Sequence, residues 1–336
     1  MRLLAMLHAY PEHHNAGAEW MVHTLLRAAV ERGHEVDVVL SNPAPGGSYV
    51  LDGVRVHPFR SKSDPFDYVD DATVIVTHLE NTQRASTIGR MRGVPVVHVL
   101  HNTFDQTKGW LRKGPCNLAV YNSEWMRRDF ELWMDTYQVP RPPSVVVRPP
   151  VLADDYRTRH GDHVTLVNLF PSKGSKTFWA LAERMPDVRF LAVTGGYGDQ
   201  DIRDLPNVEV LPNTPGHQMR ERVYARTKIL LMPSVYESWG RVGVEAMVSG
   251  IPVIAHPTEG LKESLAGAGV FVDRDDIDGW EREIRRLLTP RAYGTASRRA
   301  KARAAELDPA EDLKRWCLAV EALAEQRGRL RALARL

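Results

Sequence analysis

The sequence has very few cysteines and no long apolar run. Cys116 and Cys317 are the only cysteines in 336 residues, and neither lies in a CxxC pair, so neither a disulfide framework nor a zinc knuckle is indicated. No apolar stretch approaches the roughly 20 residues that are needed to span a bilayer. The apolar run in MRLLAMLHAY is too short for a signal sequence and suits a first buried strand better. We therefore expect a cytoplasmic protein that is at most peripheral to a membrane.

An excess of charge of either sign is also missing. The 44 basic and 42 acidic side chains leave a formal charge of +2, which by itself predicts no polyanionic partner. Short-period repeats and low-complexity tracts are absent. With 43% hydrophobic residues the chain has the composition of a folded globular protein, and its length favours about two domains.

Short apolar runs alternate with amphipathic segments along the first half of the chain. This alternation is typical of βα units on a parallel sheet. A helix is expected from about Gly17 to Arg32, and another begins at Ser123, which suits an N-cap position. The expected strands are residues 3–7, 35–40, 73–77, 95–100 and 117–121.

The pattern restarts after a proline-rich connection. Five prolines lie between residues 139 and 155, where neither a helix nor a central strand would tolerate them. We expect a boundary there, and hence an α/β fold of two doubly wound parallel-sheet domains, 1–150 and 151–310, that face a central cleft. Helices are expected after Pro290, the last of them over residues 311–336 and packing back on the N-terminal domain. The expected strands of the second domain are residues 164–169, 188–193, 208–211, 228–232, 252–255 and 269–272.

The stretch YESWGRVGVEAM contains Glu237 and Glu245, separated by seven residues. A helix is predicted to start near Gly240, so Glu237 lies in a loop and Glu245 in the second helical turn. Backbone amides at a helix N-terminus attract anions, and glycine lets a phosphate approach closely. Carboxylates accept hydrogen bonds from sugar hydroxyls. The alternative is an i, i+4 ion pair between Glu245 and Arg241 on the surface. The amides expected to cradle the anion belong to Ser238, Trp239, Gly240 and Arg241.

This stretch resembles the E-x7-E element of the retaining glycosyltransferases of family 4. Three further segments match the family in order: NAGAE (15–19) resembles its GGxE loop, LVNLFPSKG (166–174) its GRxxxxKG segment, and GIPVIA…EGLKE (250–263) its downstream element. The resemblance covers most of the chain. It implies the GT-B fold, with two Rossmann-like domains, of which the first faces the acceptor and the second binds the nucleotide sugar.

Two positions depart from the family pattern. Ala16 replaces the first glycine of the loop, although Gly17 is retained and can still approach the donor phosphates. Asn168 stands where the family has arginine, five residues before Lys173. Asparagine brings no charge. The second cation expected beside Lys173 must then come from elsewhere, and the alternatives that stay open are Lys176, Arg148 and Arg203.

Two histidines lie on the strand and exit loop of VVHVLHNTFD (96–105). His101 matches the family's histidine at the carboxyl end of this strand, and since histidine titrates near neutral pH it could share a proton with a hydroxyl or contact the donor sugar. His98 is interpreted as a structural strand residue. His8, His13 and His14 flank the glycine loop, and we assign them no role. Short Asp-x-Asp strings at 199–201 and 273–275 are interpreted as chance, so no metal site is predicted.

The resemblance implies a metal-independent, cofactor-free hexosyltransferase that retains anomeric configuration. Its donor would be a UDP- or GDP-linked sugar and its acceptor a hydroxyl group. Lys173 and the amides after Glu237 would stabilise the departing diphosphate, Glu245 would hold the ribose, and Glu237 would position the sugar. His101 would contact the sugar or the acceptor.

Other functions stay open at this point. A catalytically weak nucleotide-sugar-binding module is compatible with Ala16 and Asn168, and a GT-B epimerase or phosphorylase would share the fold. The acceptor could be a lipid, a small natural product, a polysaccharide or a modified nucleic acid. Peripheral membrane contact is an alternative for two basic segments, SEWMRRDFELWM (123–134) and RGRLRALARL (327–336).

Overall fold

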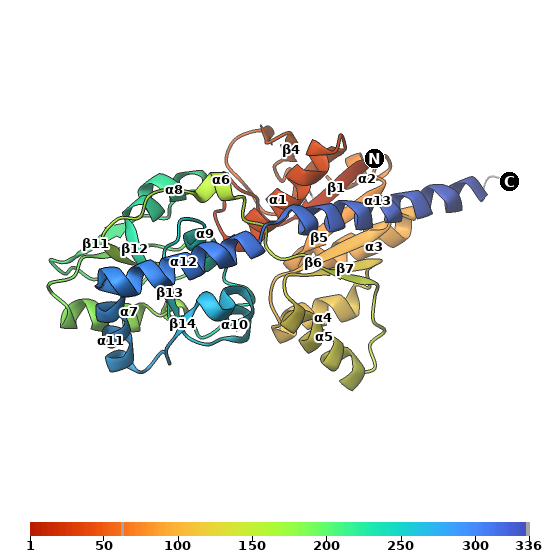
Figure 1. Cartoon of the computed structure of the whole chain (residues 1–336). Helices are drawn as coiled ribbons and strands as arrows, with labels where there is room; N and C mark the ends of the chain where they lie inside the picture. The colour runs from red at the N-terminus through yellow and green to blue at the C-terminus, as the bar shows by residue number, and fades with distance from the viewer. Residues whose placement is uncertain (62–63, 334–336) are drawn as a thin grey trace. The chain divides into compact units, whose positions relative to one another are not determined.

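The computed structural model describes residues 1–61 and 64–333 (Figure 1). Two compact units share the chain: the first comprises Met1–Pro150 together with the C-terminal segment from Ala310, and the second comprises Val151–Pro309. The first unit is therefore discontinuous in sequence. No helix in the described part of the chain is long and apolar enough to cross a membrane.

The first unit is built on an eight-stranded sheet. Its order is β3-β4-β2-β1-β5-β6-β7-β8, and all pairs are parallel except β3 with β4. The strands are β1 (Arg2–Leu7), β2 (Glu35–Leu40), β3 (Tyr49–Leu51), β4 (Val54–His57), β5 (Val74–His78), β6 (Val96–Leu100), β7 (Leu118–Tyr121) and β8 (Ser144–Val146). The helices are α1 (Gly17–Glu31), α2 (Phe66–Val69), α3 (Thr82–Arg92), α4 (Asp105–Lys113), α5 (Glu124–Thr136) and α13 (Ala310–Leu333).

The second unit has a fully parallel six-stranded sheet. Its order is β11-β10-β9-β12-β13-β14. The strands are β9 (His163–Val167), β10 (Phe190–Val193), β11 (Val208–Leu211), β12 (Thr227–Met232), β13 (Val253–Ala255) and β14 (Val270–Phe271). The helices are α6 (Ala153–Tyr156), α7 (Ser175–Arg184), α8 (Met219–Arg222), α9 (Arg241–Val248), α10 (Glu259–Leu265), α11 (Ile277–Leu288) and α12 (Pro290–Glu306).

Each strand predicted from the sequence is present, which confirms the α/β class. The central strands read as continuous Val, Ile, Leu and Ala runs because helices cover both faces of such a sheet. Ser123 caps α5 by accepting a hydrogen bond from Met126 N (3.3 Å). In the proline-rich connection, β8 forms at the sheet edge over three residues that contain no proline, as expected for a strand flanked by prolines.

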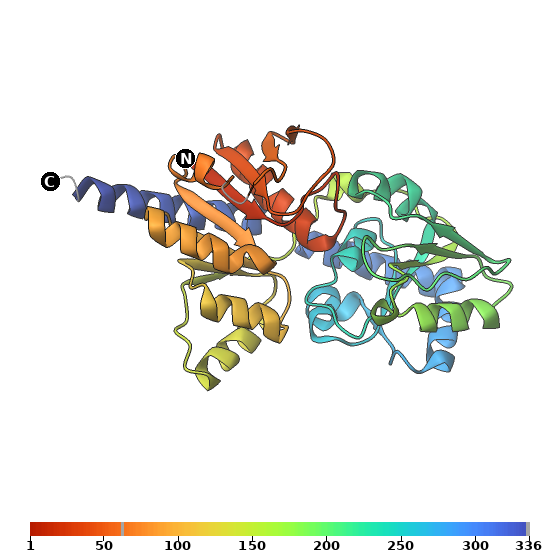
Figure 2. The same ribbon diagram turned by 180° about the vertical axis from the view of Figure 1, so that it is seen from behind.

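The C-terminal helix α13 completes the core of the first unit. It packs beside α1, a contact visible from both sides (Figures 1 and 2). Trp316 is fully buried and donates from Nε1 to Leu25 O (2.8 Å). Glu321 accepts two hydrogen bonds from Arg32, and its Oε1 lies 2.8 Å from His34 Nε2. Residues 334–336 of the basic RGRLRALARL segment lie outside the described residues.

Helix α5 carries the other segment considered for membrane contact. Its apolar side packs against the sheet, with Met126, Phe130 and Met134 buried and the Phe130 ring 5.4 Å from that of Tyr121. Arg127 pairs with glutamates of its own helix at 2.8 and 2.9 Å. These contacts explain the aromatic residues by packing alone, and membrane contact of α5 stays a prediction.

Candidate functional site

The strand order of the second unit brings together two loops that are distant in sequence. From β9 the sheet grows toward β10 and β11, and the chain then returns to place β12 on the other side of β9. Ligands of doubly wound sheets bind at the carboxyl ends of the strands at such a reversal. The loop after β9 carries Lys173, and the loop after β12 carries Glu237. Val235 N donates to Ser172 O (2.9 Å) and ties the two loops together.

Lys173 and Glu237 form a close ion pair within this site. Lys173 Nζ lies 2.5 Å from Glu237 Oε1, and the same oxygen accepts from Ser234 Oγ at 2.9 Å. Burial alone would lower the pKa of Lys173, but the Glu237 carboxylate outweighs it and raises that pKa. The site therefore holds a protonated amine against a carboxylate at the end of the sheet.

Glu245 belongs to a second, more deeply buried cluster. Tyr224 donates its hydroxyl to Glu245 Oε2 (2.5 Å), and Arg241 Nε lies 3.2 Å from Glu245 Oε1. Arg241 also donates to the Tyr156 hydroxyl at 3.0 Å. The i, i+4 pair considered from the sequence thus exists, but Glu245 is only 5% exposed. It is a buried network and not a surface salt bridge.

The loop between these two clusters leads into α9 through a turn that requires glycine. Gly240 is the N-cap with φ 81°, and a Cβ there would lie 2.3 Å from Leu261 Cδ2. Because φ and packing already require glycine, its presence needs no ligand to explain it. Trp239 is 2% exposed, and its indole N–H has no hydrogen-bond partner among residues 1–61 and 64–333. Trp239 and Arg241 therefore offer a ligand their backbone amides, since both side chains are buried in this unit; Ser238 is partly exposed.

Asn168 has a local structural role in place of the expected arginine. Its φ is 81°, a left-handed conformation that asparagine tolerates better than most residues. Its Oδ1 accepts from Phe170 N at 3.0 Å, which closes a turn just before Lys173. A Cβ at Gly195 would lie 2.4 Å from this oxygen. The side chain thus shapes the loop after β9.

The predicted residues of the first unit lie at the carboxyl ends of its strands. Gly17 starts α1 and is exposed, and nothing lies within 4 Å of a Cβ built on it. His101 follows β6, and its Nε2 lies 3.0 Å from His78 Nδ1. Burial lowers the pKa of His101 to about 4 and holds that of His78 well below its usual value. His101 is therefore neutral at pH 7, whereas the sequence predicted a histidine whose pKa lies near neutral pH. His98 is fully buried and contacts Ser86 Oγ at 3.1 Å, as a structural residue would.

Two protein-family models match the chain. Residues 15–169 match the model described as Glycosyltransferase Family 4, and residues 174–290 match Glycosyl transferases group 1. The two matches leave out residues 1–14 with β1, residues 170–173 and the helices after residue 290. The chain belongs to the family 4 glycosyltransferases.

Curated relatives of this family 4 glycosyltransferase match a limited part of it. It is 32% identical over 133 residues to a protein named D-inositol 3-phosphate glycosyltransferase from Mycobacterium sp. (strain KMS), a match covering 35% of this chain and 30% of the relative. A relative of the same name from Mycobacteroides abscessus is 33% identical over 138 residues, with 37% and 31% covered. The aligned segments thus span less than a third of either relative.

Solved structures with the GT-B fold match the whole chain. Sucrose-phosphate synthase from Thermosynechococcus elongatus superposes with a TM-score of 0.72 at 17% identity, covering 99% of each chain. Anabaena HepE, crystallised in complex with UDP-glucose, gives 0.71 at 17% identity and covers 100% of each chain. At this identity the similarity concerns the fold, which is GT-B with C-terminal helices.

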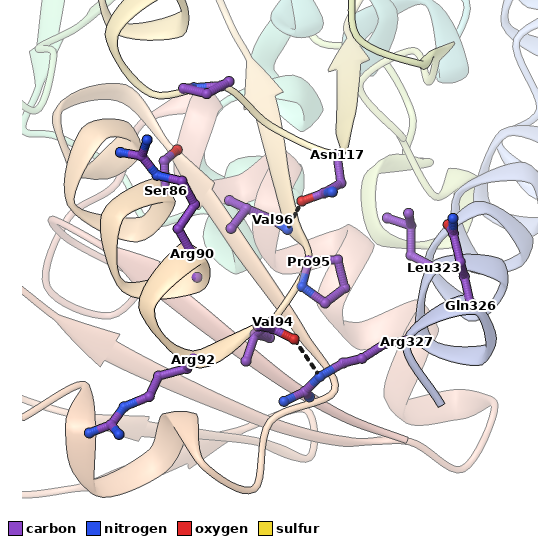
Figure 3. Close-up of a pocket in the computed structure, with 13 residues that line it drawn as sticks. Ser86, Arg90, Arg92, Val94, Pro95, Val96, Asn117, Leu323, Gln326 and Arg327 are labelled. Atoms are coloured by element: carbon purple, nitrogen blue, oxygen red, sulfur yellow. Dashed lines mark hydrogen bonds between the residues drawn. The ribbon is translucent and has the colours of Figure 1, made fainter. Parts of the chain in front are cut away.

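The first unit contains a pocket of about 470 Å³. Figure 3 shows it between α3, the starts of β6 and β7, and α13. Arg327 reaches its rim and donates from Nε to Gly93 O (2.9 Å). Pro95 and Asn117 precede β6 and β7, so this pocket is at the amino ends of the strands, the edge opposite to that used by ligands of such sheets.

Sequence reasoning missed an arginine beside Lys173. Arg274 Nη2 lies 3.4 Å from Pro171 O, in the 3₁₀ turn Pro171–Lys173. The three residues considered as replacements for the missing arginine pair with other groups or are exposed. Arg148 pairs with Asp312 in the first unit (2.6 Å), Arg203 pairs with Asp201 and Glu183 (both 3.3 Å), and Lys176 is exposed on α7. Arg274 follows β14 and is the middle residue of the Asp-x-Asp string at 273–275, which was interpreted as chance, so the sequence gave no reason to assign this arginine a role.

Proposed function

We propose that the chain is a retaining glycosyltransferase that moves a hexose-like sugar from a UDP- or GDP-linked donor to a hydroxyl acceptor. The observation that carries the proposal is the Lys173–Glu237 pair, 2.5 Å apart, beside the N-terminus of α9. A cation and the backbone amides at a helix N-terminus suit a diphosphate, and the carboxylate suits sugar hydroxyls. The crystal structure of HepE with UDP-glucose supports a nucleotide-sugar donor for this fold.

The proposed chemical step retains the configuration of the anomeric carbon. The bond between the anomeric carbon and the diphosphate breaks while the acceptor oxygen bonds to that carbon on the same face, and the acceptor proton passes to the leaving phosphate oxygen. Lys173 and the amides of residues 238–241 stabilise the charge that develops on the diphosphate. Glu237 orients the sugar and fixes the Lys173 amine. Glu245 accepts hydrogen bonds from the ribose hydroxyls through the lone pairs that Tyr224 and Arg241 do not occupy. The proposed step requires no metal.

Donor-dependent transfer is the direct test of this function. The protein is incubated with UDP-glucose, GDP-mannose and a panel of hydroxyl acceptors, and we expect one acceptor to gain the mass of one sugar. The same donor should raise the thermal midpoint, because a ligand that binds the folded state stabilises it. Donor stabilisation without transfer or hydrolysis would identify a nucleotide-sugar-binding module. A chain that no nucleotide sugar stabilises would contradict the proposal.

Arg274 is proposed to supply the cation that Asn168 does not. Its side chain is 18% exposed and its guanidinium lies against the turn that carries Lys173. Arg274→Ala should lower kcat by about a hundredfold, in the range seen when one preorganised charge-stabilising group is removed. Arg203→Ala is the matched control and should leave kcat unchanged. Equal rates for both variants would exclude Arg274 from catalysis.

A further inference from the structure

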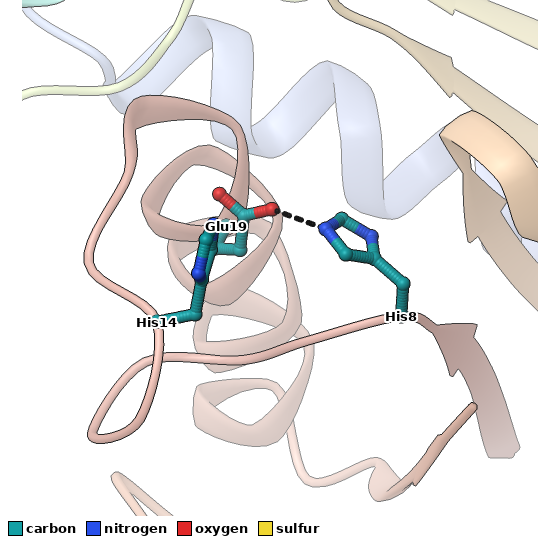
Figure 4. A group of neighbouring side chains, drawn as sticks. All are labelled: His8, His14 and Glu19. Carbon is teal, nitrogen blue, oxygen red and sulfur yellow. Dashed lines mark ion pairs between the residues drawn. The ribbon is translucent and has the colours of Figure 1, made fainter. Parts of the chain in front are cut away.

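Three potential metal ligands converge in the first unit, around the loop that carries Gly17 and apart from the Lys173–Glu237 pair in sequence. His8 directly follows β1, His14 lies in the loop before α1, and Glu19 is in the first turn of α1. One ligand atom from each lies within 4.8 Å of the others. Figure 4 shows the Glu19 carboxylate between the two imidazoles, with the ion pair to His8 Nε2 at 3.2 Å. In the described ranges, this is the one such group of three, and the Asp-x-Asp strings form none.

Of these three residues Glu19 is buried and the two histidines are partly exposed, and two polar atoms of the group lack a partner. Glu19 is 2% exposed, yet its Oε2 has no hydrogen-bond partner in the described part of the chain, and neither has His8 Nδ1. A buried carboxylate oxygen without a partner is costly. The His8 contact satisfies only one of the two oxygens.

We infer that His8, His14 and Glu19 bind one divalent transition-metal ion of the Zn²⁺ type. Two imidazoles and one carboxylate are a donor set that zinc accepts, with a fourth position left for water. Bonds of 2.0–2.1 Å in a tetrahedron place ligand atoms about 3.3 Å apart. His8 Nε2 and Glu19 Oε1 are 3.2 Å apart, close to this value, and His14 offers a ligand atom within 4.8 Å of both residues. An ion held by both carboxylate oxygens would also give Glu19 Oε2 the partner that it lacks.

The position of these ligands gives the ion a mechanical consequence. It would clamp residues 8–14 of the β1–α1 connection to the first turn of α1, immediately around Gly17. The reversal of strand order in this sheet lies at β1, between β2 and β5, so the clamp sits where such a sheet presents its loops to ligands. The chemical step proposed above does not need the ion. Its binding can therefore be measured without donor or acceptor.

Titration of the full chain with Co²⁺ tests this inference. After chelator treatment and dialysis, Co²⁺ alone should give d–d absorption that saturates at one ion per chain and is abolished by added Zn²⁺. His14→Ala and Glu19→Gln should each raise Kd more than about tenfold, because ligand-sphere changes typically cost at least that factor. His13→Ala is the matched control, since His13 is the exposed neighbour whose ring contacts Tyr49, and its Kd should not change.

Two outcomes would overturn the site. One is the absence of both Co²⁺ absorption and a Zn²⁺-dependent rise of the thermal midpoint; the other is wild-type affinity in His14→Ala. Circular dichroism of the metal-free variants verifies folding. If Glu19→Gln does not fold, His14→Ala decides alone, because His14 is a partly exposed loop residue. Failure of the transfer assay would not affect this result.

Discussion

Glu237→Gln should lower kcat for sugar transfer by about a hundredfold or more and change donor affinity little. Lys173 Nζ and Ser234 Oγ both donate to Glu237 Oε1, at 2.5 and 2.9 Å. Glutamine keeps the shape and an acceptor oxygen but loses the charge that holds the amine and the sugar. The effect is assigned to kcat because the charge matters most as the bond to the diphosphate breaks. Initial rates at saturating donor, with donor Kd from calorimetry, give the two quantities.

A carboxylate–arginine pair outside the family's motifs in the same unit provides the control. Glu209 accepts from Arg226 Nη1 at 2.8 Å on the surface, so Glu209→Gln removes the same chemical group from an exposed pair. It should keep full activity. If Glu237→Gln transferred sugar at the wild-type rate, Glu237 would have no part in the reaction, and the Lys173 contact would be structural.

Arg241→Ala should destabilise the second unit by about 3–5 kcal/mol. Removing one partner of a buried ion pair leaves the other charge uncompensated, which has a cost of this size. The side chains of Arg241 and Glu245 are 10% and 7% exposed. The substitution leaves the Glu245 carboxylate with Tyr224 as its remaining partner and removes the donor to the Tyr156 hydroxyl. We expect a matching loss of hydrogen-exchange protection in α9.

The measurement must report on each unit separately, because a two-unit chain need not unfold in one step. Hydrogen exchange by mass spectrometry at increasing urea gives the opening free energy of peptides from the second unit. Arg285→Ala is the control: it removes an exposed partner of Asp187, 2.8 Å away, and should cost less than about 1 kcal/mol. An Arg241→Ala effect as small as this control would show that the network contributes little.

The fold was largely predictable because buried parallel strands leave a strong signal. Runs such as EVDVVL and PVVHVL match β2 and β6 almost residue for residue. The β3–β4 hairpin was missed although its turn is recognisable: Asp52 and Gly53 have φ of 47° and 79°, the Asp-Gly pattern of a tight hairpin. Its strands are short, and β3 lies at the sheet edge with Val50 66% exposed, so no apolar run marks them.

The site was predictable only in part, because it depends on which strands are neighbours. Lys173 and Glu237 are 64 residues apart, and the adjacency of β9 and β12 brings them together. The sequence identified both residues but not their direct contact, nor Ser234 beside them. Tyr224 and Tyr156 gave no signal, because aromatic residues in such positions are ordinarily core. Asn168 was interpreted only as the loss of the family's arginine charge. Its left-handed backbone and its hydrogen bond from Phe170 N show that it also shapes the turn before Lys173.

The discontinuity of the first unit determines the order in which the chain can mature. During synthesis, all of Val151–Pro309 is made before α13, the helix that carries Trp316 and Glu321. Residues 1–150 therefore wait for this helix until the second unit is complete. Until α13 has been synthesised, Leu25 and the apolar residues near it on α1 lack the contacts with Trp316 that bury them. Exposed apolar surface of this kind favours aggregation. We therefore expect the second unit to fold from one continuous stretch, and removal of α13 to destabilise the first unit.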